Sequence, residues 1–470
     1  MVKKSVFILV YIVLTIGYAY ACATIPQPPP LTLNSIKPIE KNDRILILAP
    51  HPDDEAIGCA GIIQEAVDKG ADIRIAYLTN GDHNQVAFIV YEKRLTFRKG
   101  EFIHMGDVRR KEAAKAMKLL GVDEKKLIFL GYPDFGTLTI FKDFWQSARP
   151  YKSMLTRISQ VPSKENFSFG APYKGENILA DIKKILRDYK PNKIFVSHPA
   201  DTNVDHKALY LFLRIALCDL GAEIPRPEIY PYLVHCLGWP LPRHYHPQLG
   251  LNPPRQFSGS QVEWLKFDLT PEQLNKKYQA ILCHRSQTSS SAFYLLSFAR
   301  KNELFGDYPD VELKKEESPL QKAISFFGFS NMFADSGPGA TFESSKQLTE
   351  NKGQVSYGLS GDILLIRVDK PRELNRKFRL QLYLFGYSTK IPFASMPKIR
   401  IITKYKKFKV FDARKMIKAQ GIDLEFNHKE LILKVPLKIL GDPDFILSAV
   451  KTYTSSMHVD TTSFRNIIIK

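Results

Sequence analysis

Short apolar segments alternate with helical segments over the first two thirds of this chain, and this alternation limits the possible folds more than any other feature. The apolar runs lie at residues 44–49, 73–79, 127–130 and 193–197. Helical spacing of apolar residues occupies 60–69, 108–120, 178–189 and 271–300. Short buried strands separated by helices indicate a mostly parallel sheet with helices on both faces, an α/β fold. Functional groups then collect at the carboxyl ends of the strands.

A different pattern follows in the last third of the chain. Short alternating strands at 363–368, 378–385, 398–403 and 430–436 predict an all-β domain, most simply a sandwich. Residues 307–340, first charged and then rich in Gly, Ser and Pro, read as a linker. We therefore expect an α/β domain over 42–306 and a β-sandwich over 341–470. Residues 135–176 have no clear period and predict a long loop insertion over the functional edge of the sheet.

The first 23 residues have the pattern of a secretory signal. Lys3 and Lys4 precede an uncharged apolar run, which ends in small residues spaced as Ala19-x-Ala21 or Ala21-x-Ala23. The same run is long enough to remain as a membrane anchor, and Cys22 is an alternative site for a lipid. Residues 24–41, which include several prolines, read as a stiff spacer. In each case we expect the bulk of the chain to be exported, to a periplasmic or extracellular location.

The first chemically distinctive cluster directly follows the first predicted strand. His51, Asp53, Asp54 and Glu55 place an imidazole and three carboxylates within five residues. A solvated acidic turn that caps the next helix is the simpler interpretation. The functional interpretation is a metal site, because His51 and Asp54 can supply one nitrogen and one oxygen to a borderline cation such as zinc. Asp53 would then be left free as a base.

A second cluster follows the fourth predicted strand, in residues 197–206. His206 begins a helix and is the candidate third metal ligand, while Asp205 can orient an imidazole from behind. A single histidine here would more often be a helix cap or a core residue. Two His/Asp clusters at the ends of two parallel strands favour the metal site.

These residues resemble a known family. His51-Pro52-Asp53-Asp54-Glu55 together with Asp205-His206 is similar to the motifs of the PIG-L/LmbE-like zinc-dependent N-acetylglucosaminyl deacetylases, over about residues 42–305. The resemblance implies a Rossmann-like α/β fold and one zinc ion. It also implies that His51, Asp54 and His206 hold the zinc and that Asp53 is the general base.

The resemblance extends to the substrate pocket but departs at one position. Arg109 and Asp134 match family residues that line the sugar pocket. Where the family often has a histidine three residues before the last ligand, this chain has Asn203. That histidine is credited with stabilising the oxyanion or protonating the leaving amine. His198 and His235 are therefore the candidates for this role here.

The charge balance narrows the choice of partners. The chain has 67 Lys and Arg against 48 Asp and Glu, a net charge of +19, and residues 335–470 hold 24 basic and 13 acidic residues. Such an excess is typical of proteins near nucleic acid, an anionic membrane surface or an acidic polymer. Because we expect the chain to be exported and it has no nucleic-acid-binding motif, we expect no nucleic acid among its partners. An anionic envelope surface or an acidic glycan is the expected neighbour.

The predicted β-sandwich also carries sequence features of interest. Residues 431–440, Gly441-Asp442-Pro443 and Val459-Asp460 loosely resemble the family 9 carbohydrate-binding modules. Tyr383, Phe385 and Tyr387 alternate along one strand and so share a face. These aromatic residues either stack on sugars or belong to a core, and the second is the commoner case.

Together these features predict an exported zinc-dependent hydrolase. Its expected reaction removes the N-acetyl group from an N-acetylglucosamine-type sugar in a glycan or glycoconjugate. Two alternatives stay open: another metal-dependent amidohydrolase or phosphoesterase, and a non-catalytic glycan-binding protein of the envelope. The sequence does not specify the sugar or the oligomeric state.

Overall fold

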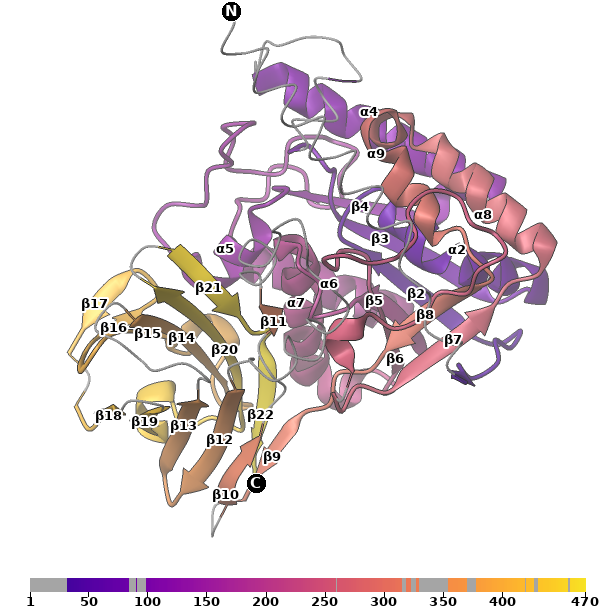
Figure 1. Ribbon diagram of the computed structural model, residues 1–470. Helices are drawn as coiled ribbons and strands as arrows, with labels where there is room; N and C mark the ends of the chain where they lie inside the picture. The colour runs from indigo at the N-terminus through magenta and orange to yellow at the C-terminus, as the bar shows by residue number, and fades with distance from the viewer. Residues whose placement is uncertain are drawn as a thin grey trace, which may run out of the picture.

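The computed structural model shows an α/β domain followed by a β domain that packs against it (Figure 1). The residues that it describes are 32–83, 90, 99–258, 260–314, 318–322, 327–328, 354–369, 378–418, 420–426, 430–454 and 457–470. The predicted signal segment and residues 24–31 of the predicted spacer lie outside these ranges. Among the described residues, no helix combines the length and apolar character needed to cross a bilayer.

An eight-stranded sheet forms the centre of the α/β domain, in the order β1-β7-β8-β6-β5-β2-β3-β4. Its strands are β1 (Asn34–Ser35), β2 (Arg44–Ala49), β3 (Asp72–Thr79), β4 (Leu127–Tyr132), β5 (Lys193–Ser197), β6 (Glu228–Tyr232), β7 (Trp264–Asp268) and β8 (Asn302–Gly306). All neighbours pair in parallel except β8, which is antiparallel to β6 and β7. The predicted mostly parallel α/β sheet is confirmed.

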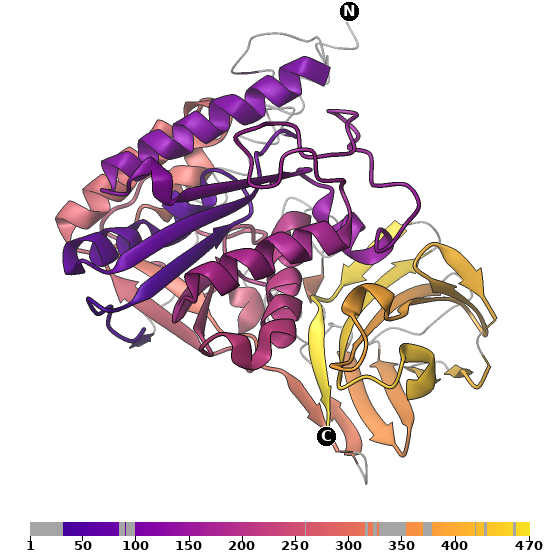
Figure 2. The same ribbon diagram turned by 180° about the vertical axis from the view of Figure 1, so that it is seen from behind.

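Helices cover both faces of this sheet. They are α2 (Asp54–Lys69), α4 (Lys99–Leu119), α5 (Thr137–Asp143), α6 (Gly175–Tyr189), α7 (Val204–Leu220), α8 (Pro271–Cys283) and α9 (Arg285–Leu295). In β2, Ile45 and Ile47 belong to the core beneath α2, α4 and α8, while Leu46 and Leu48 belong to the core beneath α5, α6 and α7. Successive side chains of a strand point to opposite faces, so a continuous apolar run is what a strand buried on both sides requires. Figure 2 shows the second helical layer between the sheet and the β domain.

The strand order reverses between β2 and β5, the point at which open α/β sheets have their ligand crevice. From β2 the chain proceeds to β3 and β4 on one side of the sheet, whereas β5 lies on the other side of β2 and leads to β6. Ligand sites of open α/β sheets form at such a reversal of strand order, outside the carboxyl ends of the two strands. The two predicted His/Asp clusters directly follow β2 and β5, so both lie at this point.

The β domain consists of two sheets, in agreement with the predicted all-β region. A five-stranded sheet has the order β10-β12-β13-β19-β18, and a larger sheet runs β11-β21-β20-β14-β15-β16-β17, with β22 beside β20 and β9 beside β22. The strands are β9 (Val311–Leu313), β10 (Ser318–Lys322), β11 (Phe327–Gly328), β12 (Gln354–Ser360), β13 (Ile363–Asp369), β14 (Phe378–Tyr387), β15 (Lys398–Lys404), β16 (Lys407–Asp412), β17 (Lys415–Ile417), β18 (Asp423–Phe426), β19 (Glu430–Pro436), β20 (Phe445–Thr454), β21 (Met457–Thr461) and β22 (Arg465–Ile469). Alternate apolar residues of both sheets fill the core between them, for example Leu364 and Ile366 of β13 with Leu382 of β14.

Two predicted connecting segments are more structured than expected. The predicted linker 307–340 contains β9, which pairs in parallel with β22, and β10, which pairs with β12. The predicted spacer 24–41 contains β1, which pairs with β7, and the buried Ile36 and Ile39. These strands are too short to give a periodic pattern of their own, and they form because a strand already in place offers a free edge.

The aromatic residues that alternate along β14 form an interface between the two domains. Tyr383, Phe385 and Tyr387 are 5%, 1% and 3% exposed and join the same core as α5, α6 and α7. The ring of Phe141 in α5 lies 6.0 Å from that of Phe385, centroid to centroid. Of the two interpretations of this face, the structure selects the core, and a sugar-stacking role for these rings is ruled out by their burial.

Candidate active site

Three of the predicted site residues meet in the crevice between β2 and β5. Nδ1 of His51 and Nε2 of His206 each lie 3.1 Å from Oδ2 of Asp54. One ligand atom from each residue can be chosen so that all lie within 4.8 Å of one another, and all three residues are buried. His51 lies in the turn after β2, Asp54 begins α2, and His206 lies in the first turn of α7. The parallel pairing of β2 with β5 therefore brings together residues 152 or more positions apart in the chain.

Two carboxylates lie behind His51. Nε2 of His51 is 3.2 Å from Oδ1 of Asp134 and 3.3 Å from Oδ2 of Asp205. Asp205 itself accepts hydrogen bonds from the backbone N–H groups of Phe135 and Thr137 and from the Thr137 hydroxyl. These donors fix the carboxylate, which in turn fixes the ring of His51. Asp134 thus lies against the imidazole, where the resemblance predicts a residue of the sugar pocket.

Asp201 performs the same task for the other side of the site, and no role for it is predicted from the sequence. Its Oδ2 is 3.1 Å from Nδ1 of His206, and its Oδ1 is 3.4 Å from Nδ1 of His235. It also accepts hydrogen bonds from the backbone N–H groups of Asn203, Val234 and His235. Burial raises the pKa of Asp201, but His206 and His235 lower it further, to well below its usual range. In the sequence, Asp201 could have been noticed only because it lies in the second cluster, five residues before His206.

Asp53 stands in the strained turn that begins α2. Its φ of 140° lies in a region that residues other than glycine rarely adopt, and such strain clusters at functional sites. Nη2 of Arg109 lies 3.1 Å from Oδ1 of Asp53 and donates to the carbonyl of Pro52. Burial raises the pKa of Asp53 to about 6, and the charge of Arg109 limits that rise. A carboxyl group with this pKa can accept a proton near neutral pH.

Arg109 is held in place by a glycine. It donates from Nη1 to the carbonyl of Gly81, whose φ is 69°. A Cβ atom at this position would lie 2.2 Å from Nη1 of Arg109, so only glycine allows the guanidinium group to reach the turn. Arg109 therefore supports the geometry of the Pro52-Asp53 turn, in addition to any contact with a substrate.

Glu55 closes the turn from inside. The side chain is buried and accepts a hydrogen bond from the backbone N–H of Asp53. Burial raises the pKa of Glu55 to about 8, and the charges of Asp53 and Asp54 add to this rise. Glu55 therefore has a structural role in this turn, because its carboxyl group binds the backbone of Asp53.

The residues present suit a divalent metal ion. Nε2 of His206 is buried 3.1 Å from Oδ2 of Asp54, but the contact does not have the geometry of a hydrogen bond. Burial raises the pKa of Asp54, but His206 and His51 lower it well below its usual range, so the carboxylate is anionic. Two imidazole nitrogens and one carboxylate oxygen form a donor set that zinc accepts in sites where water is the fourth ligand.

Comparison with known proteins identifies the first domain. Residues 46–217 match the family model of PIG-L, described as GlcNAc-PI de-N-acetylase. Residues 46–217 therefore form a PIG-L family domain. The match ends within α7, and β6, β7 and β8 complete the sheet beyond it.

Two curated relatives match parts of the chain. A glucosamine-6-phosphate deaminase-like protein of Bacteroides thetaiotaomicron is 24% identical over 276 residues, which cover 55% of this chain and 37% of the relative. The 1D-myo-inositol 2-acetamido-2-deoxy-alpha-D-glucopyranoside deacetylase of Mycobacterium sp. (strain KMS) is 33% identical over 90 residues, 19% of this chain and 28% of the relative. The chain thus spans only about a third of the length of these relatives.

Solved structures with similar chains include two deacetylases. N,N'-diacetylchitobiose deacetylase from Pyrococcus horikoshii is 20% identical, with a TM-score of 0.34, over 56% of this chain and 84% of that chain. The zinc-inhibited form of teicoplanin deacetylase is 16% identical, with a TM-score of 0.35, over 56% of this chain and 97% of that chain.

The structure separates the two candidate histidines for the remaining role. His198 lies outside the His51–Asp54–His206 cluster, and its ring is stacked 5.5 Å from that of Trp264. Its Nδ1 accepts from the backbone N–H of Ala200, and its Nε2 is 3.2 Å from the carbonyl of Asp307. Burial lowers its pKa to about 4. Both ring nitrogens of His198 thus have partners, and its ring lies in the core, so the geometry does not favour the predicted catalytic role.

His235 has the position that His198 lacks. Its ring is 4.7 Å from that of His206, and its side chain is 35% exposed, so it reaches both the site and the solvent. It follows β6, a strand beyond the matched PIG-L segment. Geometry therefore leaves His235 as the candidate acid.

Asn203 and Phe135 complete the rim of the site. Asn203 is the N-cap of α7, and its side chain accepts from the backbone N–H of Asp205, so its role in the structure is to begin the helix that carries His206. Phe135, not predicted from the sequence, is 51% exposed beside Asp134. Its φ is 58°, and its backbone N–H is held by Asp205. An exposed aromatic ring at this point can pack against the face of a sugar.

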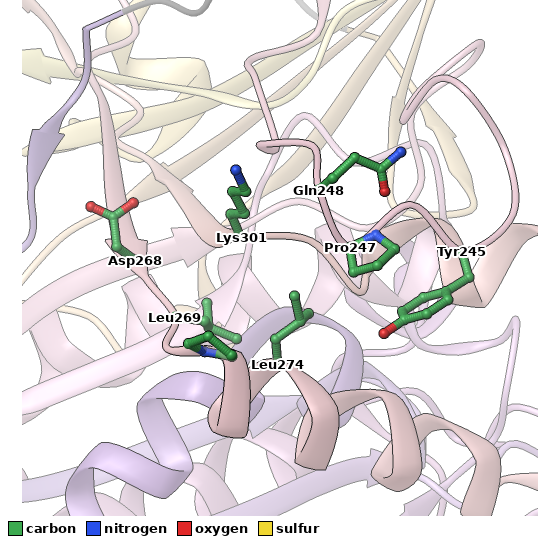
Figure 3. A pocket seen from close by; sticks show the side chains of 8 residues that line it. Tyr245, Pro247, Gln248, Asp268, Leu269, Leu274 and Lys301 are labelled. Carbon is green, nitrogen blue, oxygen red and sulfur yellow. The ribbon is translucent and has the colours of Figure 1, made fainter.

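A cavity of about 600 Å³ lies elsewhere in the α/β domain (Figure 3). It is bounded by the first turns of α8 and by loops that carry Tyr245 and Lys301. None of its lining residues belongs to the His51–Asp54–His206 cluster or to the residues that support it. It is therefore a separate feature of the surface.

Proposed function

We propose that this chain is a zinc-dependent amide hydrolase that removes the acetyl group from an N-acetylglucosamine-type sugar in a glycan or glycoconjugate. The observation that carries the proposal is the convergence of His51, Asp54 and His206 in a PIG-L domain, with the carboxylate of Asp53 beside them. The family description and the Mycobacterium relative, both named for the deacetylation of an acetamido sugar, support the choice of reaction.

His51, Asp54 and His206 would hold the zinc ion. Bound there, zinc would lower the pKa of a water ligand to about 7 and polarise a carbonyl group. Asp134 and Asp205 keep the ring of His51 in place, and Asp201 does so for His206. The site is thus pre-organised by three carboxylates that need not touch the substrate.

Asp53 and His235 supply the proton transfers. Asp53 takes a proton from the attacking water at its carboxylate oxygen while the new C–O bond forms at the acetamide carbon. The C–N bond then breaks, and the nitrogen gains a proton from Asp53 or His235, so that acetate and a free amino sugar leave. His235 is suited to this step because its ring is beside His206 and is part-exposed. Arg109, 3.1 Å from Oδ1 of Asp53, holds this carboxylate in place.

Acetate release by the full chain tests the reaction. Wild type with zinc should release acetate from N-acetylglucosamine compounds, and a chelator should stop the reaction. Asp53→Asn should retain zinc and lose about 10² to 10⁴-fold in kcat. Asp188→Asn is the matched control, since Asp188 is exposed on α6 and pairs with Lys184.

The outcomes separate the rival functions. Unchanged turnover in Asp53→Asn would remove Asp53 as the base. Release of phosphate from phosphate esters without any acetate from acetylated sugars would establish the phosphoesterase instead. Zinc binding with neither product, together with retention on a glycan column, would establish a binding protein.

The proposed location is outside the cytoplasm, on the basis of the signal pattern in residues 1–23. The excess of basic residues in the β domain suits an anionic envelope surface or an acidic glycan. N-terminal sequencing of the protein from fractionated cells tests the first point. A cytoplasmic protein that keeps its first residues would contradict it.

A further inference from the structure

Three lysines from both domains gather where the PIG-L domain meets the β domain. Lys142 is in the last turn of α5, Lys207 in the first turn of α7, and Lys451 on β20. Burial lowers the pKa of Lys142 to about 8, and the charge of Lys451 contributes to this shift. Burial lowers the pKa of Lys207 to about 8; the charge of Asp201 opposes this shift, and the charges of Lys451 and Lys142 add to it. The three ammonium groups are therefore close enough to repel one another in a part-buried setting.

Strand register explains why Lys451 faces the helices. Lys451 pairs with Gln381, two residues along β14 from Tyr383, so it lies on the face that carries the buried aromatic residues. Nζ of Lys142 lies 5.4 Å from the centre of the Tyr383 ring. Arg400 of β15 pairs with Tyr383 and adds a fourth positive charge to the same face. The buried aromatic interface between the domains is therefore bordered by the basic side chains of Lys142, Lys207, Lys451 and Arg400, which we call the basic rim.

These lysines lack partners that other buried lysines of this chain have. Lys193 pairs with Asp43 at 2.6 Å and Lys277 with Glu303 at 2.8 Å. Within the described residues, by contrast, Lys142, Lys207 and Lys451 form neither an ion pair nor a side-chain hydrogen bond. Nε of Arg400 is likewise buried and has no hydrogen-bond partner among the residues that the structure describes.

Two acidic residues, Asp143 and Asp201, act on this cluster, and neither balances it. Asp143 interacts with Lys142, Arg400 and Arg414, and burial raises its own pKa. Asp201, which acts on Lys207, already lies against His206 and His235, so two shared carboxylates leave the cluster with a net positive charge. Like charges kept together away from water are costly unless an anion neutralises them.

The rim is close to the catalytic centre. Lys207 directly follows the proposed ligand His206. Lys142 lies five residues along α5 from Thr137, which binds Asp205, a rise of about 7 Å. Two of the lysines therefore belong to the helices that carry His206 and support Asp205.

We propose that Lys142, Lys207 and Lys451 form an anion site that binds the carboxylate or phosphate group of an acidic sugar next to the N-acetylated one. The site needs both domains, since Lys451 comes from β20 and the other two lysines from α5 and α7. The proposal rests on the proposed deacetylase function for the nature of the neighbouring sugar. The β domain then selects the substrate, which gives it a role beyond attachment to a surface.

Steady-state kinetics on matched substrates tests the selection. A glucuronic acid–N-acetylglucosamine oligosaccharide is compared with a neutral N-acetylglucosamine oligosaccharide of the same length. Lys451→Met and Lys142→Met should each raise KM for the acidic substrate about tenfold and leave kcat and the neutral substrate unchanged. Lys451→Arg should restore most of the affinity. Lys390→Met, an exposed lysine of the same domain, is the control with the same loss of charge.

Equal KM values for wild type and both methionine variants on the acidic substrate would overturn the proposal. So would an equal loss on acidic and neutral substrates, which would assign the lysines a structural role. A tenfold effect that vanishes in high salt is expected, because screening weakens such contacts.

Binding of inorganic phosphate by the full chain provides a test that needs no catalysis. Phosphate at millimolar concentration should raise the unfolding temperature of wild type and of Lys390→Met, relative to chloride at equal ionic strength. In Lys451→Met and Lys142→Met this increase should disappear, while the temperature without phosphate should stay the same or rise as the repulsion is relieved. A phosphate effect that persists in both variants would refute the site. Failure of the deacetylase proposal would instead show as absent acetate release with the phosphate effect intact.

Discussion

Asp201→Asn is the change that best tests how the site is organised. The carboxylate lies 3.1 Å from Nδ1 of His206 and accepts three backbone N–H groups, from Asn203, Val234 and His235. An amide of the same shape keeps one oxygen but replaces the other with an NH₂ group. At least one donor then faces another donor, and the negative charge that holds the imidazole is lost.

The expected magnitude follows from these contacts. Each charge-assisted hydrogen bond lost costs about 1.5 to 3 kcal/mol, and removal of the carboxylate behind a metal-binding histidine typically lowers metal affinity about 10 to 100-fold. Titration of the full chain with zinc against a chromophoric chelator measures this affinity. We expect Asp201→Asn to show a Kd raised by that factor, and Asp188→Asn to match wild type. Circular dichroism confirms that each variant is folded. Zinc affinity within twofold of wild type in folded Asp201→Asn would refute the argument that this carboxylate orients His206.

Three further predictions concern charge and contact. The charge of Arg109 opposes the rise in the pKa of Asp53 to about 6, so the acid limb of the kcat/KM profile should lie at or below pH 6 in wild type. This limb should move to higher pH in Arg109→Gln and move less in Arg109→Lys. An acid limb at the same pH in Arg109→Gln would contradict the ion pair. Burial lowers the pKa of Lys398 to about 7, so between pH 7 and 10 the unfolded chain binds a proton that the folded protein does not. The free energy of unfolding should therefore rise with pH by up to about 1.4 kcal/mol per pH unit. Denaturant titrations at several pH values should show this slope in wild type and not in Lys398→Met. Phe135→Ala should raise KM severalfold with little change in kcat, whereas Phe135→Tyr should keep the wild-type value, if the exposed ring packs on the sugar.

The α/β fold and the three proposed metal ligands could be predicted because both depend on local pattern. The runs at β2 and β5 are short, apolar and followed at once by His51 and by the cluster that contains His206. Parallel strands end at the same edge of a sheet, so residues after two such strands meet without further information. No comparable rule gave the distance of Asp134 from His51, which depends on the loop after β4.

Tertiary contacts decided what the sequence left open. His198 and His235 were equal candidates, yet the first packs between Trp264 and Asp307 and the second beside His206. The difference arises from β6 and from contacts with residues more than sixty positions later. The supposed linker likewise contains β9, whose pairing with β22 joins residues at opposite ends of the β domain and cannot be read from either segment alone.

The aromatic seam formed by Tyr383, Phe385 and Tyr387 bears on how this protein can change during evolution and in the laboratory. A module joined by a flexible tether can be exchanged among enzymes, because neither partner hides surface from water. Here the outer face of the larger sheet is part of the same hydrophobic cluster as α5, α6 and α7. Separation of the domains would expose the apolar residues of this sheet face and those of the helices that cover it, which favours aggregation. Enzymes that contain this α/β domain without the β domain must therefore carry polar residues on these helices, and deletion of residues 307–470 is a poor route to a smaller, soluble catalyst.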